Sequence, residues 1–465
     1  MLEQLFLDLF RGRRVAILGY GREGRSTFRR LKQFVPGLKV HICDCNADLR
    51  EAAEKDRESS GVQWFLGTSY LKGLDDADII IKSPGIPFSL LNGLNLQGRI
   101  TSQSELFLEL FRDQVCGITG TKGKSTTASL LHHILNAGGK PTVLAGNIGT
   151  PCFDVLDHIT PNTHIVFEMS SHQLQNIGLS PHIAILLNIF QEHLDHYTSF
   201  SEYQEAKMNI ARYQNVRDHF IFNPDNPLVY SLVSGMDIPS HLISLGSSFG
   251  HAARIFCEAD DMVFLEGKHR ISLTGLCSQS AIPGQHNLQN IRAAVAASLR
   301  MDIAADVIIK AVNGFKGLPH RLEFVGTFDG VHYYNDSIST IPESTMAALN
   351  AFPDTATIIL GGTDRGIDYK PLMDFLSGSP VVYLFFTGDA GRRMKSMADS
   401  MRDFTGKKLL FCASFDEAVR LAVEKTPSGR ACLLSPAAAS YDAFEDFEER
   451  GQRFRDLVRE FNRKS

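Results

Sequence analysis

The sequence predicts an α/β protein with three domains: a Rossmann-like N-terminal domain, a central P-loop ATPase-type domain and a C-terminal Rossmann-like domain. Short apolar runs alternate with helical stretches along the whole chain, which is typical of doubly wound parallel sheets. Two glycine-rich turns each follow such a run and precede a helix. A chain of 465 residues is also too long for a single hydrophobic core.

The first domain, residues 1–112, begins with a strand, a glycine turn and a helix. The turn is Gly19-Tyr-Gly21-Arg-Glu-Gly24, and Asp44 ends a second strand about twenty residues further on. Alone, this pattern is typical of a dinucleotide site, so a nicotinamide-dependent oxidoreductase is one alternative. A hydride-transfer enzyme has no need of a second, ATP-type loop. We therefore assign the turn to another nucleotide, such as a UDP group.

The second domain, residues 113–316, carries a phosphate loop between a strand at 115–118 and a helix at 127–136. The loop residues are Gly120, Thr121, Lys122, Gly123, Lys124, Ser125 and Thr126. Backbone N–H groups, a helix N-terminus and the Lys124 ammonium can surround a phosphate chain here, and the Ser125 hydroxyl can ligate Mg²⁺. The usual pattern has a glycine where Ile118 stands, so the loop belongs to a variant class.

Three more residues of this domain are candidates for the same site. Glu168 ends an apolar strand, from which a carboxylate can reach Mg²⁺ at the phosphate loop; a surface carboxylate is an equal alternative. His193 follows another strand end, where a structural histidine is more common than a metal ligand. Lys207 lies in a helical stretch at 201–213, and its local pattern indicates a solvated side chain.

The third domain, residues 317–465, follows a glycine- and proline-marked junction at 314–319 that is suited to a hinge. Its alternating strands and helices predict a third parallel sheet. Arg321, Asp336 and Ser435 follow the junction or strand ends, where such sheets place ligands. They predict a second substrate site, which the hinge can close onto ATP.

Composition and charge exclude several classes of protein. The net charge of −5 gives no general attraction to nucleic acid or to anionic membranes. The N-terminal residues lack the features of a signal peptide, and no apolar run is long enough to span a bilayer. We therefore expect a cytoplasmic protein without membrane insertion, and a monomer. The eight cysteines are scattered, mostly in or beside apolar strands, and are expected to be reduced.

In their order along the chain, these residues resemble the muramyl ligase family over essentially the whole length. The matching motifs are Gly117-Ile-Thr-Gly-Thr-Lys-Gly-Lys-Ser-Thr126, Gly146-Asn147-Ile-Gly149, Glu168-Met-Ser-Ser171, His193-Leu-Asp195, Ala206-Lys207, Gly284-Gln-His-Asn287 with Asn290, Leu318-Pro-His-Arg321, Asn335-Asp336-Ser337, and Leu434-Ser-Pro-Ala437 with Ser440, Phe444 and Phe447. The resemblance is greatest to the branch of the family that joins glutamate, expected to be D-glutamate, to UDP-N-acetylmuramoyl-L-alanine.

The resemblance implies that the three domains bind UDP, ATP and the amino acid, and that ATP and two Mg²⁺ ions are required. It implies a UDP-substrate site of Gly19, Gly21, Gly24, Asp44, Asn46, Ser83, Gly85 and Asn147. ATP would meet residues 120–126 together with Asn287, Asn290, Arg321 and Asp336. The implied Mg²⁺ ligands are Ser125, Glu168, His193 and Lys207, the lysine as a carbamate. Glutamate would meet Thr340, Arg365, Ser440 and Phe447.

The implied reaction transfers the γ-phosphoryl group of ATP to the alanyl carboxylate, and the amine of glutamate then attacks the acyl phosphate. Lys124, Arg321 and the metal ions would neutralise phosphate charge. Two departures concern the glutamate site, because Ile338 and Arg365 stand where the family commonly has lysines. The same ligation with L-glutamate is therefore one alternative, and a non-catalytic nucleotide-binding regulator is another.

Overall fold

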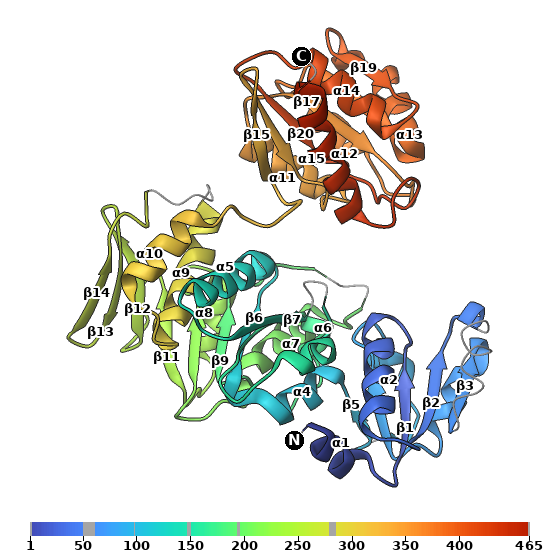
Figure 1. Ribbon diagram of the computed structural model, residues 1–465, viewed down its shortest axis with the longest axis vertical. Coiled ribbons are helices and arrows are strands. Elements are labelled where there is room, and N and C mark those ends of the chain that lie inside the picture. Colours follow the sequence, from blue (N-terminus) through green and yellow to red (C-terminus); the bar gives the residue numbers. More distant parts are fainter. Residues whose placement is uncertain are drawn as a thin grey trace. The chain divides into compact units, whose positions relative to one another are not determined.

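The strands of the described residues form three β-sheets with helices packed against them (Figure 1). The structure is a computed structural model and describes residues 2–49, 61–96, 98–146, 150–192, 196–278 and 285–463. The chain divides into two compact units, Met1–Phe315 and Lys316–Ser465. The first two sheets lie in the first unit and the third sheet lies in the second. The predicted α/β class is confirmed.

The first sheet has the strand order β3-β2-β1-β4-β5, and its strand pairs are all parallel within the described residues. Its strands are β1 (Arg14–Leu18), β2 (Lys39–Asp44), β3 (Val62–Leu66), β4 (Ile79–Lys82) and β5 (Ile100–Thr101). The chain leaves β1 toward one neighbour, β2, and later returns on its other side as β4. The glycine turn after β1 therefore lies where the strand order reverses, which is the usual ligand position in such sheets.

The second sheet has the order β14-β13-β12-β11-β10-β9-β6-β8-β7. Its strands are β6 (Val115–Thr119), β7 (Thr142–Gly146), β8 (His164–Glu168), β9 (Ile183–Leu186), β10 (His219–Phe222), β11 (His241–Leu245), β12 (Ala253–Glu258), β13 (Asp261–Glu266) and β14 (His269–Leu273). Strands β12 to β14 form an antiparallel meander, and the remaining pairs are parallel. β6 is fully buried between β8 and β9, so the phosphate loop lies at a reversal of strand order.

The third sheet has the order β15-β16-β20-β17-β18-β19. Its strands are β15 (Glu323–Phe328), β16 (Val331–Asn335), β17 (Thr355–Gly361), β18 (Tyr383–Thr387), β19 (Lys408–Phe411) and β20 (Ala431–Leu434). The expectation of a purely parallel sheet is wrong at one edge, because β15 pairs antiparallel with β16. Asp329 and Gly330 join these strands with φ of 49° and 77°, as a tight hairpin turn requires.

Helices cover both units. Those of the first unit are α1 (Leu2–Phe10), α2 (Arg22–Phe34), α4 (Gln103–Phe111), α5 (Lys124–Ala137), α6 (Ser171–Leu174), α7 (Phe200–Arg212), α8 (Pro227–Ser234), α9 (Gln285–Arg300) and α10 (Ala305–Gly314). Those of the second are α11 (Pro342–Ala351), α12 (Lys370–Ser377), α13 (Gly388–Ser400), α14 (Phe415–Lys425) and α15 (Phe447–Arg463). No helix in the described ranges is both long and apolar enough to cross a membrane.

Local sequence sets the start of several helices. Ser102, Ser199 and Ser414 precede α4, α7 and α14, and each hydroxyl accepts a hydrogen bond from the backbone N–H of the glutamate three residues further on. This bond satisfies one of the N–H groups that a helix leaves unpaired at its N-terminus, and the acidic residue in the first turn favours the helix dipole. The serine-to-glutamate spacing therefore fixes where these helices begin.

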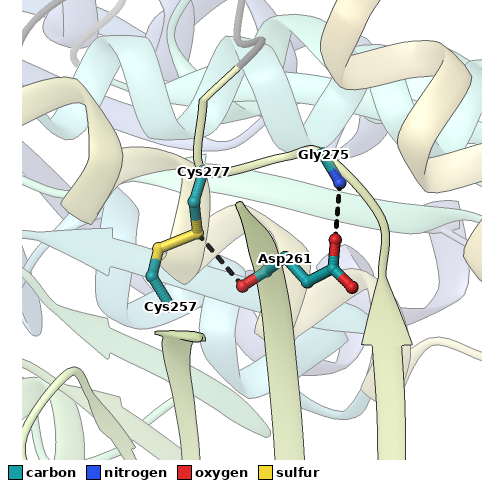
Figure 2. The surroundings of a disulfide bond; sticks show 4 residues. All are labelled: Cys257, Asp261, Gly275 and Cys277. Atoms are coloured by element: carbon teal, nitrogen blue, oxygen red, sulfur yellow. Dashed lines mark hydrogen bonds between the residues drawn. A yellow bond between two sulfur atoms is a disulfide. The ribbon is translucent and has the colours of Figure 1, made fainter. Parts of the chain in front are cut away.

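One disulfide bond joins the antiparallel meander of the second sheet (Figure 2). Cys257 at the end of β12 is bonded to Cys277, which follows β14. The sulfur of Cys277 lies 3.5 Å from the carbonyl oxygen of Asp261, and the backbone N–H of Gly275 donates to the Asp261 carboxylate at 3.0 Å. The expectation that all eight cysteines are reduced is therefore wrong for this pair. The two hairpin turns bring together residues 20 positions apart, which the sequence spacing does not reveal.

We expect the disulfide to stabilise the first unit. It closes a loop with a sequence separation of 20, and chain-entropy arguments assign about 3 kcal/mol to a loop of this length. In urea denaturation, the free energy of unfolding of the wild-type chain should fall by about this amount when reductant is added. The double variant Cys257→Ser/Cys277→Ser should match the reduced chain. Identical midpoints for the oxidised and reduced wild type would contradict the expectation.

Candidate active site

The phosphate loop has the backbone geometry that its glycines allow. Gly120 and Gly123 have φ of 156° and 88°, and Lys124 begins α5 directly afterwards. A Cβ atom at Gly123 would lie 2.3 Å from Oδ1 of Asn290, so a side chain at this position has no room. Asn290 also donates to Oδ1 of Asn287 at 3.2 Å. The structure therefore places Asn290 beside the loop and Asn287 in contact with Asn290.

Asn188, which follows β9, holds the loop from the other side. Its Oδ1 accepts from the backbone N–H of Lys122 at 2.8 Å, and its Nδ2 donates to the Lys122 carbonyl at 3.0 Å. The Asn188 carbonyl accepts from the N–H of Thr121 at 2.9 Å. These three bonds fix the loop backbone. Asn188 is not among the residues predicted for the site, although an amide directly after an apolar strand is a visible signal.

Two lysines meet at one carbonyl of the loop. Lys124 Nζ and Lys207 Nζ each donate to the Gly120 carbonyl oxygen at 2.9 Å. Lys207 is only 2% exposed, and its ammonium lies 4.9 Å from the centre of the Tyr203 ring. Burial, and next the positive charge of Lys124, hold the pKa of Lys207 well below its usual range. The solvated side chain indicated by local pattern is therefore wrong.

Glu168 lies at the carboxyl end of β8, next to the strand that leads into the loop. It pairs in register with Ile118 of β6, and the following N–H, of Met169, donates to the Ile118 carbonyl at 2.9 Å. Glu168 is 1% exposed, so it is not a surface carboxylate. Ser125 is half-buried in the first turn of α5. The structure brings both to one edge of the second sheet; His193 lies outside the described residues.

The glycine turn of the first sheet is held by Asp44 and Ser83. The Asp44 carboxylate accepts from the N–H of Tyr20 at 2.7 Å and from the N–H of Asn46 at 2.8 Å. The Ser83 hydroxyl donates to the Gly19 carbonyl at 2.9 Å. The acidic residue that a dinucleotide pattern would assign to a ribose is thus bonded to the backbone of the turn itself.

A cavity of about 660 Å³ connects this turn with the phosphate loop. The predicted UDP-site residues that line it are Gly19, Gly21, Asp44, Ser83 and Gly85. The lining residues at and near the phosphate loop are Thr121, Lys124 and Lys207. Gly24 packs beneath the turn instead, since a Cβ atom there would lie 2.0 Å from the Gly19 carbonyl oxygen. Asn46 is exposed beside the turn, and Asn147 lies outside the described residues.

In the second unit, Asp336 follows β16 and is 2% exposed. Its carboxylate accepts from the Ser435 hydroxyl at 2.8 Å and from the N–H of Leu322 at 3.2 Å. Burial raises its pKa to about 6, although those hydrogen bonds and the charge of Arg321 oppose the rise. Arg321 Nε is buried without a hydrogen-bond partner among the described residues. The structure therefore places Arg321 and Asp336 together.

The predicted glutamate-site residues lie around the ends of β16, β17 and β20. Arg365 Nη2 donates to the Thr340 carbonyl at 3.2 Å, which joins two of them. Ser440 follows β20 and is 2% exposed. Phe447 begins α15, and its carbonyl accepts from the Ser337 hydroxyl at 2.8 Å. Thr340, Arg365 and Ser440 thus follow the carboxyl ends of three parallel strands at one edge of the third sheet, and Phe447 contacts the loop after the first of them.

A buried arginine at this edge is not among the residues predicted from the sequence. Arg450 is 2% exposed and donates to the Ser337 hydroxyl at 2.9 Å, the Ser337 carbonyl at 2.8 Å and the Ala438 carbonyl at 3.1 Å. It thereby ties the loop after β16 to the loop after β20. The signal is its position in α15, because Arg450 shares the apolar face formed by Phe454 and Leu457 at helical spacing.

We expect Gly123→Ala to weaken ATP binding at least tenfold, which corresponds to about 1.4 kcal/mol. The new Cβ would displace Asn290. An alanine in a left-handed conformation also adds a backbone strain of about 1–2 kcal/mol. Gly139→Ala is the matched control, because Gly139 also has positive φ, at 69°, but has nothing within 4 Å of its added Cβ. Titration with a fluorescent ATP analogue measures both; equal losses would contradict the steric argument.

Comparisons with known proteins agree with this arrangement. The Mur ligase middle domain matches residues 118–298, and the Mur ligase glutamate ligase domain matches residues 320–438. The UDP-N-acetylmuramoylalanine–D-glutamate ligase of Symbiobacterium thermophilum is 34% identical over 454 residues, which are 96% of this chain and 97% of that relative. The ligase of the same name from Geobacillus kaustophilus is 34% identical over 97% of this chain and 98% of its own.

A solved structure shares the fold at much lower sequence similarity. MurF from Acinetobacter baumannii is 17% identical, with a TM-score of 0.57 over 98% of each chain. This likeness bears on the fold, whereas the two relatives at 34% identity extend over nearly the whole sequence. The chain therefore belongs to the Mur ligase family.

Proposed function

We propose that the protein is an ATP-dependent ligase that joins D-glutamate to UDP-N-acetylmuramoyl-L-alanine in peptidoglycan precursor synthesis. The observation that carries this proposal is the 660 Å³ cavity, which is lined both by the phosphate loop and by the glycine turn of the first sheet. A reaction between ATP and a nucleotide-linked substrate needs two nucleotide sites that open onto one space. The near full-length similarity to ligases named for this reaction supports the choice of substrates.

The residues are suited to transfer of the γ-phosphoryl group of ATP to the alanyl carboxylate. The amine of glutamate then attacks the acyl phosphate, an amide forms and inorganic phosphate leaves. The work of the protein is to position the reactants and to neutralise charge. Lys124 stands at the phosphate loop for this purpose. In the second unit, Arg321 and Asp336 bind ATP, and Thr340, Arg365, Ser440 and Phe447 bind glutamate.

Two Mg²⁺ ions fit the oxygen donors at the loop. Ser125 offers a hydroxyl and Glu168 a buried carboxylate at the adjoining strand end, both of which are ligands that Mg²⁺ accepts. We assign His193 as a further ligand. Bound Mg²⁺ supplies positive charge that offsets the charge of the triphosphate and of the transferring group. We further propose that the chain has three domains, residues 1–112, 113–316 and 317–465. We also propose that the protein is monomeric and cytoplasmic.

Lys207 is a carbamate in the active enzyme under this proposal. Two ammonium groups on one carbonyl repel each other, and the lowered pKa of Lys207 favours its neutral amine. The nitrogen lone pair of that amine can form a bond to the carbon of carbon dioxide, with loss of one proton to solvent. The product carries a negative charge and two oxygens, so it removes the repulsion and adds a metal ligand.

Phosphate release tests the whole assignment. Purified protein with ATP, Mg²⁺ and UDP-N-acetylmuramoyl-L-alanine should release phosphate when D-glutamate is added, and Lys124→Ala should release almost none. Faster phosphate release with L-glutamate would show that L-glutamate, and not D-glutamate, is the substrate. No release with either enantiomer would favour a nucleotide-binding regulator, and a nicotinamide absorbance change would favour an oxidoreductase.

We expect Lys207→Ala to lose at least about a hundredfold in kcat, because it removes charge-neutralising ligands from the phosphoryl-transfer site. Acetate or formate should restore part of the activity by occupying the vacant oxygen positions, and chloride at the same ionic strength should not. Full activity without additive would contradict the carbamate. So would electron density for an unmodified amine in an ATP-bound crystal grown with bicarbonate.

Arg365 is expected to bind a carboxylate of glutamate, because its planar fork suits that group. Arg365→Ala should raise KM for glutamate roughly tenfold or more, as loss of a charge-assisted hydrogen bond predicts, and change KM for ATP much less. Arg392→Ala is the control, since Arg392 is exposed on α13 and stacks on Phe411. A larger effect on ATP than on glutamate would assign Arg365 to the phosphate site.

A further inference from the structure

A cluster of polar side chains lies beneath the glycine turn of the first sheet. Glu23, the second residue of α2, accepts a hydrogen bond at Oε1 from Gln173 Nε2 at 2.7 Å. Its backbone carbonyl accepts from Gln103 Nε2 at 3.2 Å. Oε2 of Glu23 is buried without a hydrogen-bond partner among the described residues. Glu23 thus connects the turn with α6, which follows the strand that ends in Glu168.

The hydrogen bonds of Gln173 fix the direction of its amide. Its Oε1 accepts from the backbone N–H of Ser170 at 2.9 Å and from the Ser170 hydroxyl at 3.2 Å, which completes the cap of α6. The amide NH₂ must therefore point to Glu23. This donor is satisfied by a carboxylate or by the carbonyl oxygen of a protonated carboxyl, so the link between the turn and α6 survives protonation of Glu23.

The position of Glu23 makes its charge unfavourable when an anion binds. Gly19, Gly21 and Glu23 all line the cavity at the N-terminus of α2, whose first N–H groups are a natural diphosphate site. An ionised carboxylate at the same helix end places a second negative charge beside the diphosphate. The unfavourable interaction is removed when Glu23 takes up a proton.

The surroundings of Glu23 leave its carboxyl close to protonation at neutral pH. Burial raises its pKa to about 7, although the Gln173 hydrogen bond and the charge of Lys82 oppose the rise. Burial lowers the pKa of Lys82 to about 8, so Lys82 stays cationic at pH 7. The thiol of Cys152 also faces Glu23 and is neutral, because burial raises its pKa. Further charged or titratable side chains lining the cavity are Arg22, Asp44, Cys45, Tyr70, Lys124, His172, Glu192, Tyr203 and Lys207.

We propose that Glu23 is a positioning residue for the UDP-linked substrate, and that its carboxyl takes up one proton from solvent as the substrate diphosphate binds at α2. The inference rests on the proposed function, because it requires a diphosphate at this turn. The diphosphate diester and the alanyl carboxylate of the substrate are both ionised at neutral pH, so neither supplies nor takes the proton. The neutral carboxyl keeps its bond to Gln173 while its negative charge is removed.

Calorimetry measures the proton directly. The full chain is titrated with UDP-N-acetylmuramoyl-L-alanine at pH 7.5 in two buffers that differ in ionisation enthalpy. We expect uptake of roughly 0.5–0.8 proton per substrate, because about a quarter of Glu23 is already protonated at this pH, and affinity that weakens by up to about tenfold for each pH unit above 7. Uridine, which has no diphosphate, should bind without proton uptake.

Two variants assign the proton to Glu23. Glu23→Gln should abolish the uptake and flatten the pH dependence of substrate affinity, whereas uptake at His172 would persist in this variant. Glu105→Gln is the matched control: burial also raises the pKa of Glu105, but its carboxylate accepts from the N–H of Gly178 and does not line the cavity. It should leave the uptake unchanged.

The outcomes distinguish a failure of the inference about Glu23 from a failure of the proposed function. Substrate binding with no difference between the buffers, or with equal uptake in Glu23→Gln, overturns the inference and leaves the proposed function intact. A chain that binds no UDP-linked substrate overturns both. If Glu23→Gln does not fold, the buffer comparison on the wild-type chain with substrate and uridine still decides whether diphosphate binding takes up a proton.

Discussion

The arrangement of the active site depends on the convergence of Lys124 and Lys207 on the Gly120 carbonyl. One lysine comes from the loop and the other from α7, so the bond pair fixes the helix against the loop. Tyr203, one turn earlier in α7, adds a hydroxyl contact to Thr121 at 2.8 Å. A second positive charge beside Lys124 is unfavourable, and this together with burial favours the neutral amine of Lys207. The convergence therefore suits this point of the cavity to a modification that carries negative charge.

The first two sheets are held together by shared packing. One hydrophobic cluster runs from Phe6 and Phe28 of the first sheet's helices to Phe153, Phe167 and Phe222 around the second sheet. A buried bond from Gln103 to Thr27, at 2.9 Å, adds a polar connection. Because the turn and the phosphate loop belong to one packed unit, the cavity between them is part of the fold.

Much of the fold was predictable because buried strands are short apolar runs and the turns carry glycines. Strand β15 was missed because it is an exposed edge, where Phe324 is 53% exposed and the apolar pattern is weak. The disulfide was missed because two hairpin turns, and no motif, bring Cys257 beside Cys277.

The positions of the candidate site residues were predictable where a backbone motif fixes the local structure, as at the phosphate loop. The burial of Lys207 was not, because it depends on a carbonyl 87 positions away in the sequence. Local periodicity describes which face of α7 is apolar, but it does not describe what that face meets. The burial of Arg450, in contrast, could be predicted, since a lone arginine on an apolar helix face is visible in the sequence and implies buried hydrogen-bond acceptors.

The bonds from Asn188 to Lys122 and Thr121 mean that the phosphate loop already holds its shape before any nucleotide arrives. Ordering a flexible loop consumes part of the free energy of the contacts it makes with a ligand. A preformed loop retains that free energy for affinity. Small anions and nucleotide fragments should therefore bind this loop with high affinity for their size. A rigid mimic of the triphosphate should do the same.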